Sequence, residues 1–180
     1  MQSVTQIISP YVDFSSVPED RLALAAERGT RVHEWIAKSY RDVWQPIPKD
    51  IQGYIESFIR WKGALIEKAL LIEEKLVCDC YQFVGHVDFV GELVAQNGVI
   101  LIDWKTPITA SRSWEAQIAA YRHLVEEHSD LKGQKIARCG ALMLDPRGSM
   151  AKLLEYAFSQ ALAFNAFLSA LNAFRFFKGD

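Results

Sequence analysis

The sequence predicts an α/β protein, a single domain over residues 1–180 in which helices flank a mixed central sheet. Three observations predict this class. Half of the residues are hydrophobic and 23% are charged, which is typical of a globular chain that buries a core. Apolar residues recur at helical spacing in the first part of the chain, and short β-type runs replace them after Leu70. Another helical pattern, one more strand and a long final helix follow, and this order indicates layered packing.

The first expected helix runs from about residue 18 to residue 40, after an irregular start. Ser15 or Ser16 precedes a Pro-Glu-Asp sequence, and both proline and acidic side chains are favoured in the first turn of a helix. Gly29 could bend or split this helix, because glycine is a poor helix former.

A second helix is expected after the prolines at positions 46 and 48, with Asp50 as its cap. Apolar residues at helical spacing predict its buried side, and these are Ile51, Tyr54, Ile55, Phe58, Ile59, Leu65 and Ile66.

Three strands are expected next, over residues 71–78, 81–94 and 99–104. A turn near Asp79 separates the first two. Asn97-Gly98 lies between apolar runs and is a strong hairpin signal for the second and third.

The remaining pattern predicts a helix over residues 113–128, a fourth strand over residues 136–144 and a turn at Asp145. A long C-terminal helix follows, and its aromatic end at Phe176 and Phe177 could reach a partner subunit. Its other apolar positions are expected to pack in the core, and they are Phe158, Leu162, Phe167, Leu168, Leu171 and Phe174.

Composition limits the classes of protein to consider. The formal net charge of -2 argues against a uniformly basic nucleic-acid coat, although a local basic rim with bound metal could still offset phosphate charge. The sequence shows neither a signal peptide nor a membrane-spanning run, so a cytoplasmic protein without a membrane partner is expected.

The three cysteines have no disulfide framework spacing. Cys78 and Cys80 are interpreted as half-buried thiols, because zinc prefers four ligands and a wider spacing.

The sequence offers its clearest chemistry at Asp88, Asp103 and Lys105, on two neighbouring strands. Residues two apart on a strand face the same side, so Asp103 and Lys105 should project together while Trp104 points the other way. Two carboxylates can hold a hard divalent cation, and an amine can position a water or a developing negative charge. This set is what metal-assisted phosphodiester cleavage needs.

Three further residues are weaker candidates. Glu73 or Glu74 could add an acid from the first strand, and alternation alone does not choose between them. His86 shares the strand face of Asp88 and could contact a substrate.

Five segments follow one another along the chain, and they are Arg28-Gly29-Thr30-Arg31-Val32-His33, the pair Glu73-Glu74, Gly85-His86-Val87-Asp88, Asp103-Trp104-Lys105-Thr106 and Gln117-Ile118-Ala119-Ala120-Tyr121. In this order they resemble the RecB-like branch of the PD-(D/E)XK nuclease superfamily, over a region from about Arg28 to Leu144.

The resemblance implies a restriction-endonuclease-like core, of order αβββαβ, and a role for each matching residue. Asp88 and Asp103 match the metal-binding acids, and His33 matches a further metal ligand. Lys105 matches the lysine that orients or activates the attacking water. Gln117 and Tyr121 match a helix motif that contacts the substrate or supports the metal shell.

The chemistry of the site favours Mg²⁺ or Mn²⁺, which prefer oxygen ligands. Arg112 and Arg122 are candidates for phosphate contacts, because their helix borders the site. Some RecB-like nucleases hold an iron–sulfur cluster with four cysteines; this chain has three, so no cluster is expected.

The expected function is therefore a metal-dependent DNA nuclease, an exonuclease acting in replication, recombination or repair in a bacterial or phage-infected cell. A recombination or replication protein could be its partner. A structure-selective endonuclease and a catalytically silent DNA-binding or assembly subunit are the alternatives. The strand polarity and the preference for single- or double-stranded DNA stay open.

Overall fold

A mixed, open sheet of six strands organises the computed structural model, which describes residues 1–178 except 14, 16, 42, 107–109 and 158. The strand order is β1-β3-β4-β5-β6. β1 and β4 pair with different parts of one edge of β3, and β2 pairs with the opposite edge. β4 and β5 are parallel, as are β1 and β3, while the remaining pairs are antiparallel. The strands are β1 (Gln2–Ser3), β2 (Ile66–Cys78), β3 (Phe83–Leu93), β4 (Val99–Lys105), β5 (Ile136–Met143) and β6 (Lys152–Glu155).

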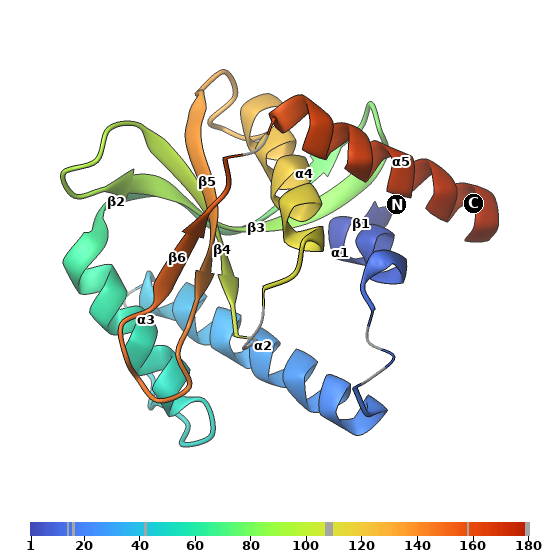
Figure 1. Ribbon diagram of the computed structural model, residues 1–180. Coiled ribbons are helices and arrows are strands. Elements are labelled where there is room, and N and C mark those ends of the chain that lie inside the picture. Colours follow the sequence, from blue (N-terminus) through green and yellow to red (C-terminus); the bar gives the residue numbers. More distant parts are fainter. Residues whose placement is uncertain (14, 16, 42, 107–109, 158, 179–180) are drawn as a thin grey trace.

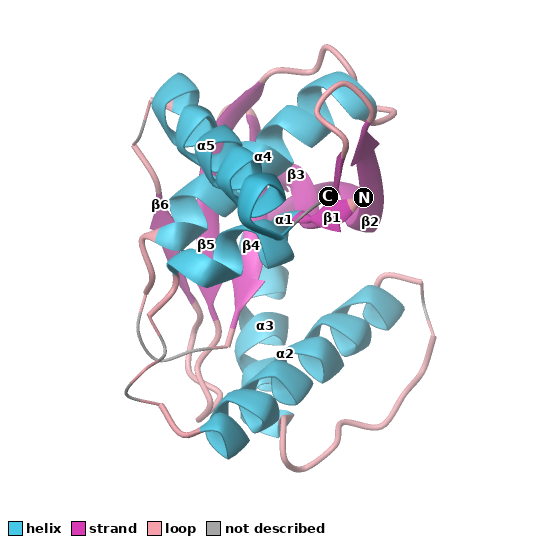
Figure 2. Cartoon of the chain, turned by 90° about the vertical axis from the view of Figure 1, so that its right-hand side faces the viewer, coloured by secondary structure: helices cyan, strands magenta, loops and turns pink. Residues whose placement is uncertain are grey.

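Helices cover both faces of this sheet, as Figures 1 and 2 show from two directions. One face packs against α1, α4 and α5, and the other against α2 and α3. Each contact contains its own cluster of buried apolar side chains. The helices are α1 (Val4–Ile8), a 3-10 turn (Ser9–Tyr11), α2 (Glu19–Ser39), α3 (Gln52–Leu65), α4 (Ser113–His128) and α5 (Gln160–Lys178). The predicted α/β class with helices on both faces is confirmed.

The prediction for the long first helix holds, and Gly29 does not interrupt α2. Pro18 precedes the helix without a side-chain cap; Ser15 instead donates its backbone N–H to Asp13, and Ser16 lies outside the described residues. The prediction that Asp50 caps the second helix is wrong. Ile51 occupies the cap position, and Asp50 forms an ion pair with Arg31 of α2.

Three segments differ from the predicted pattern. The start of the chain is regular rather than irregular, because Gln2–Ser3 pairs with β3 and Val4–Ile8 forms a helix. Ile66 belongs to β2, which begins directly after α3. β6 intervenes before the C-terminal helix, pairing with residues 140–143 of β5.

The C-terminal helix only partly follows its predicted apolar side. Phe167 and Leu171 are buried, but Leu162 is 72% exposed, so its assignment to the core is wrong. Phe158 lies outside the described residues. Phe176 and Phe177 are exposed at the end of α5, which extends past α1 at the margin of the molecule (Figure 1). No described helix is both long enough and apolar enough to cross a membrane.

The pairing of β3 leaves a gap that positions the site. β2 pairs along one edge of β3 from Phe83 to Leu93. On the other edge, β4 pairs with residues 89–92 and β1 with residues 83–84. Residues 85–88 therefore lack a described strand partner on this edge, and side chains from the surrounding elements converge there.

Candidate active site

β3 and β4 separate at the two predicted acids. Phe89 pairs with Ile102, and continuation of this register places Asp88 opposite Asp103. Instead of a backbone pair, the Asp88 carboxylate reaches across and its Oδ2 accepts the Trp104 backbone N–H at 2.7 Å. Both carboxylates are buried, Asp88 at 4% and Asp103 at 2% exposure. They line a pocket of about 400 Å³.

One side of this pocket holds His33, Glu73 and Asp88. The His33 Nδ1 atom lies 3.1 Å from Glu73 Oε1 and 3.4 Å from Asp88 Oδ1. One potential ligand atom from each of the three residues lies within 4.8 Å of the other two. The opposite ring atom, Nε2, lies 3.1 Å from the Trp104 carbonyl oxygen. An Nε2–H bond to that carbonyl would fix the tautomer in which Nδ1 is free to bind a cation.

Glu73, rather than Glu74, belongs to the site. β2 pairs Ile72 with Phe89 and Glu74 with Val87, which places Glu73 opposite Asp88. Glu73 has a φ of 46°, in the left-handed region, whereas Glu74 is exposed on the strand. Such a backbone conformation is uncommon for a residue other than glycine and is frequent at functional sites.

The other side of the pocket contains a hydrogen-bonded network centred on Gln117. Its Oε1 accepts from Lys105 Nζ at 3.0 Å, and its Nε2 donates to Tyr121 Oη at 2.9 Å and to Asp103 Oδ1 at 3.4 Å. Lys105 Nζ also lies 2.5 Å from Asp103 Oδ2. The predicted common face of Asp103 and Lys105 is confirmed. Trp104 points the other way, where its ring packs against Phe58 and Phe89.

Burial and neighbouring charges shift the pKa values of these groups. Burial raises the pKa of Asp103 to about 6, with Lys105 opposing the shift and Asp88 adding to it. Burial alone would lower the pKa of His33, but Asp88 and Glu73 outweigh burial and raise it well above the usual value. A protonated His33 thus supplies positive charge between two acids in the protein without metal.

The residues fit a hard divalent cation. Glu73 Oε1 and Asp103 Oδ2 are buried, and His33 Nδ1 lies 3.1 Å from the first and Lys105 Nζ 2.5 Å from the second. Buried carboxylates are costly unless positive charge pairs with them, and a divalent cation could add to the charge of these two side chains. Three carboxylates and one imidazole form a donor set suited to Mg²⁺ or Mn²⁺. Asp103 is turned toward Lys105 and Gln117, so it adjoins the other three ligands rather than joining their cluster.

Most of the predicted site residues therefore come together, and some additional residues join them. His33, Asp88, Asp103, Lys105, Gln117 and Tyr121 all line the pocket, as do His86 and Glu73. Thr5 of α1 also lines it and hydrogen bonds with Tyr121. No sequence signal pointed to Thr5, because its position depends on the pairing of β1 with β3.

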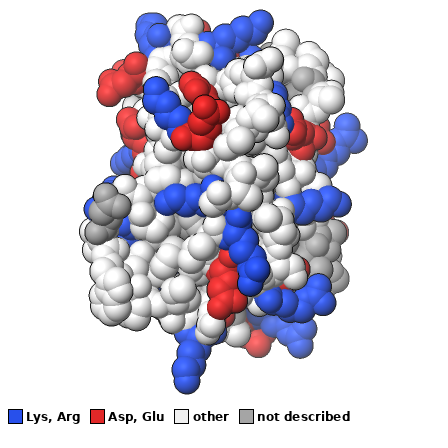
Figure 3. Space-filling view, turned by 90° about the vertical axis from the view of Figure 1, so that its left-hand side faces the viewer, with Lys and Arg blue, Asp and Glu red and all other residues white. Residues whose placement is uncertain are grey.

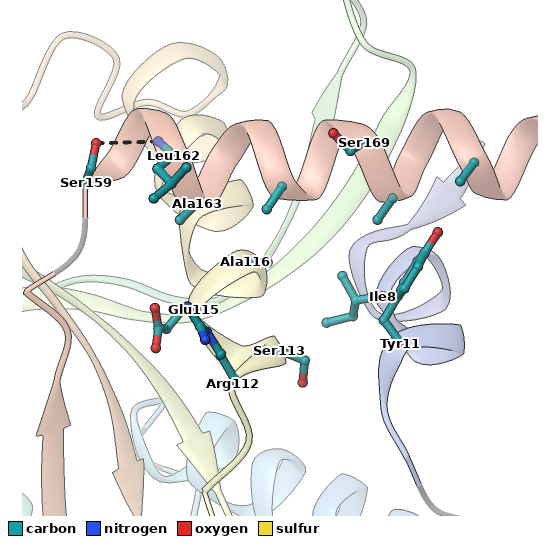
Figure 4. A pocket seen from close by; sticks show the side chains of 13 residues that line it. Ile8, Tyr11, Arg112, Ser113, Glu115, Ala116, Ser159, Leu162, Ala163 and Ser169 are labelled. Atoms are coloured by element: carbon teal, nitrogen blue, oxygen red, sulfur yellow. Dashed lines mark hydrogen bonds between the residues drawn. The ribbon is translucent and has the colours of Figure 1, made fainter.

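The two arginines do not line this pocket. Arg122 pairs with Glu126 one turn along α4, with Nε 2.9 Å from Oε1. Arg112 lines a different cavity of about 700 Å³ between α4, α5 and the N-terminal segment. Figure 4 shows this cavity beneath Leu162 and Ala163 of α5, with Ile8 and Tyr11 on the opposite side from Arg112. Neither predicted phosphate contact therefore lines the acidic pocket, which is the pocket that holds Glu73, Asp88 and Asp103.

Surface charge offers no continuous basic track on the face shown in Figure 3. Lysine and arginine side chains are interspersed there with aspartate and glutamate, and wide areas carry neither.

Comparison with known proteins finds no family model and no curated protein that matches this chain.

Proposed function

We propose that this chain is a metal-dependent DNA nuclease of the RecB-like PD-(D/E)XK type, with a restriction-endonuclease-like core. The observation that carries the proposal is the convergence of His33, Glu73 and Asp88 with the Asp103–Lys105 pair in one pocket. The residues come from α2, β2, β3 and β4, so only the folded chain assembles them. The order of motifs in the sequence supports the same assignment.

His33, Glu73, Asp88 and Asp103 would hold Mg²⁺ or Mn²⁺. When bound, such an ion would neutralise a phosphodiester and lower the pKa of a bound water. The chain's own contribution is to keep three carboxylates out of water, so that they are available to the cation. The bond between Asp88 and the Trp104 N–H fixes one of these carboxylates at the point where the strands part.

Lys105 is the residue that would orient the attacking water or bind a phosphate oxygen. Its Nζ is held between Asp103 and Gln117, and it lies 5.3 Å from the centre of the Trp114 ring. Gln117 in turn is fixed by Tyr121. Gln117 and Tyr121 therefore position the lysine, and they can contact the substrate from the same helix face.

Action on DNA ends, as an exonuclease in replication, recombination or repair, is the form of the activity that we propose. A bacterial or phage-infected cytoplasm suits this role, with a recombination or replication protein as a partner. The preference for ends rests on the resemblance of the motifs.

The test is cleavage of end-labelled linear DNA and covalently closed circular DNA, each single- and double-stranded, with Mg²⁺, with Mn²⁺ and with neither. Wild type should degrade linear DNA only when one of the ions is added. Asp88→Asn should remove cleavage by weakening cation binding, and Lys105→Ala should lower it by about 100-fold or more. Lys152→Ala, on exposed strand β6, is the matched lysine control and should cut like wild type.

The outcomes separate the alternatives. Cleavage of closed circles as fast as linear DNA would replace the exonuclease with an endonuclease. If folded wild type cuts no DNA with either ion, the enzyme proposal is wrong. Cleavage that survives both Asp88→Asn and Lys105→Ala would instead refute the assignment of the site.

A further inference from the structure

A second group of metal-ligating side chains lies outside the acidic pocket, where the turn after β2 meets the end of α4. It consists of Cys78, Cys80, His123 and His128. The Cys78 and Cys80 sulfurs are 3.2 Å apart, Cys78 Sγ lies 3.7 Å from His123 Nε2, and Cys80 Sγ lies 4.0 Å from His128 Nε2. All four potential ligand atoms lie within 4.8 Å of one another.

These separations suit a tetrahedral zinc ion. Zinc binds thiolate sulfur at about 2.3 Å and imidazole nitrogen at about 2.0–2.1 Å, so its ligand atoms lie about 3.3–3.8 Å from one another. The three distances given above bracket this range, and the remaining pairs lie within 4.8 Å. A tetrahedral shell would therefore need shifts of about 0.5–1 Å. Two thiolates and two imidazoles are also softer donors than the carboxylates of the acidic pocket, which favours zinc over Mg²⁺.

One of the two reasons to interpret Cys78 and Cys80 as half-buried thiols was that zinc needs two further ligands, and the structure supplies these in His123 and His128. His123 lies 45 residues after Cys78 in the sequence, and His128 lies 48 residues after Cys80. Only the packing of α4 against the β2–β3 hairpin brings them together.

The surroundings hold these ligands in place. Gln82 Nε2 donates to the Asp79 carbonyl at 2.6 Å, and Arg175 of α5 donates to the carbonyls of Tyr81 and Gln82, which together fix the turn that carries Cys80. Phe164 stacks on the His123 ring with centroids 4.4 Å apart. Cys78 is buried and Cys80 is exposed, so the site has a protected side and a path to solvent.

We propose that Cys78, Cys80, His123 and His128 bind a structural zinc ion. Four protein ligands close the coordination shell, which is the arrangement of structural rather than catalytic zinc. The ion would fasten the β2–β3 turn to the last turns of α4. The same helix carries Gln117 and Tyr121 at the acidic pocket, so zinc would also hold this pocket's α4 side in place. The proposal does not depend on the nuclease assignment.

The first test is the zinc content of the purified full-length protein, measured by mass spectrometry of the metal. Wild type should carry one zinc per chain. Cys80→Ser and His128→Ala should carry less than about a tenth of that. Cys139→Ser is the matched control, because Cys139 is a free thiol on β5 outside the cluster, and it should keep its zinc. Asp88→Asn should also keep zinc, which separates this site from the acidic pocket.

Cobalt reports the ligands directly. Protein loaded with Co²⁺ in place of zinc should show the visible bands of tetrahedral cobalt and a thiolate-to-cobalt absorption in the near ultraviolet. Both signals should disappear in Cys80→Ser and persist in Cys139→Ser.

Removal and return of zinc in the wild-type protein tests the proposal even if the variants fail to fold. Removal of zinc by a chelator should lower the melting temperature and expose two thiols to a thiol reagent, and added zinc should reverse both changes. A wild-type protein that binds neither zinc nor cobalt after loading would overturn the proposal. Unchanged zinc content in Cys80→Ser and His128→Ala, or a Cys78–Cys80 disulfide in the purified protein, would also overturn it.

Discussion

Asp103 is held in an environment that disfavours its charge. Burial raises its pKa, and Asp88 adds to this effect, while Lys105 opposes it. A cation in the pocket would reverse this balance, because it stabilises the ionised carboxylate. The cost of keeping Asp103 charged in the folded protein can be measured without any substrate.

The first prediction concerns the pH dependence of stability in buffer without added Mg²⁺ or Mn²⁺. The pKa of Asp103 is about 6 in the folded protein and 3.8 is its ordinary value, so between these values the folded protein keeps a proton that the unfolded chain has lost. The contribution of Asp103 to the free energy of unfolding therefore falls as pH rises, by roughly 3 kcal/mol across this interval. Asp103→Asn removes this contribution, so its stability relative to wild type should rise between pH 4 and pH 6 in urea unfolding. Parallel pH profiles for the two proteins would contradict the raised pKa.

The second prediction concerns the hydroxyl of Tyr121, which accepts the Gln117 amide. Tyr121→Phe leaves part of a buried amide without this partner and should lower the free energy of unfolding by about 1–2 kcal/mol. It should also slow DNA cleavage severalfold, because Gln117 positions Lys105. Tyr40→Phe is the matched control, since the buried Tyr40 hydroxyl has no hydrogen-bond partner among the described residues. That variant should be as stable as wild type, and equal losses in the two variants would contradict the role of Tyr121.

The strand face on which a site side chain lies could be predicted from the sequence where the strand is regular. Asp103 and Lys105 are two apart on β4 and share a face as expected. The choice between Glu73 and Glu74 could not be made, because Glu73 adopts a left-handed backbone conformation that breaks the alternation. Arg112 shows a second limit of the sequence, because a position at the start of α4 did not place its side chain in the predicted pocket.

At the scale of elements, α4 lies unusually close to β3. A Cβ atom added at Gly85 would lie 2.6 Å from Leu124 Cδ1 and 2.9 Å from a Tyr121 ring carbon. Gly85 thus allows the helix to bring Gln117 and Tyr121 over the gap in the sheet.

The third prediction follows from this contact. Gly85→Ala should push α4 away from β3, lower the free energy of unfolding by about 1–3 kcal/mol and reduce DNA cleavage. Gly63→Ala is the control, because nothing lies within 4 Å of its added Cβ on the exposed side of α3. It should leave activity unchanged and stabilise the protein by up to about 1 kcal/mol. Urea unfolding and the cleavage assay check both, and a Gly85→Ala protein as stable and active as wild type would contradict the proposed close packing.

Long periodic elements were predictable, and short or long-range ones were not. α4 occupies the predicted residues 113–128, because its apolar repeat is long and uninterrupted. β6 has four residues, too few to establish an alternation. β1 has two residues and exists only because β3 offers an unpaired edge some 80 positions later in the sequence.

At the scale of the whole molecule, the distribution of charge would determine how the proposed DNA substrate approaches the acidic pocket. The chain has a net charge of -2, and its pocket gathers Glu73, Asp88 and Asp103. Without a cation these acids repel a phosphate, and the positive charges of His33 and Lys105 are already paired with them.

The fourth prediction is that DNA affinity depends on a divalent cation. Lys105→Ala, chosen to slow cleavage, should bind labelled DNA about tenfold or more tightly with Ca²⁺ than without a divalent ion, in fluorescence anisotropy at constant ionic strength. Asp88→Asn combined with Lys105→Ala should lose most of this gain. Equal affinity with and without Ca²⁺ would show that DNA binds away from the acidic pocket.

Trp104 connects the acidic pocket with the apolar core on the opposite face of the sheet. Its backbone N–H is bound by Asp88 and its carbonyl faces His33, while its ring lies in the opposite core beside Phe58, Phe89 and Trp61. A cation that binds in the pocket should therefore change the environment of the Trp104 indole, although the ring itself lies outside the pocket. Near-ultraviolet circular dichroism and tryptophan emission should consequently follow cation titrations in real time, giving an optical signal for the site before any nucleic acid is added.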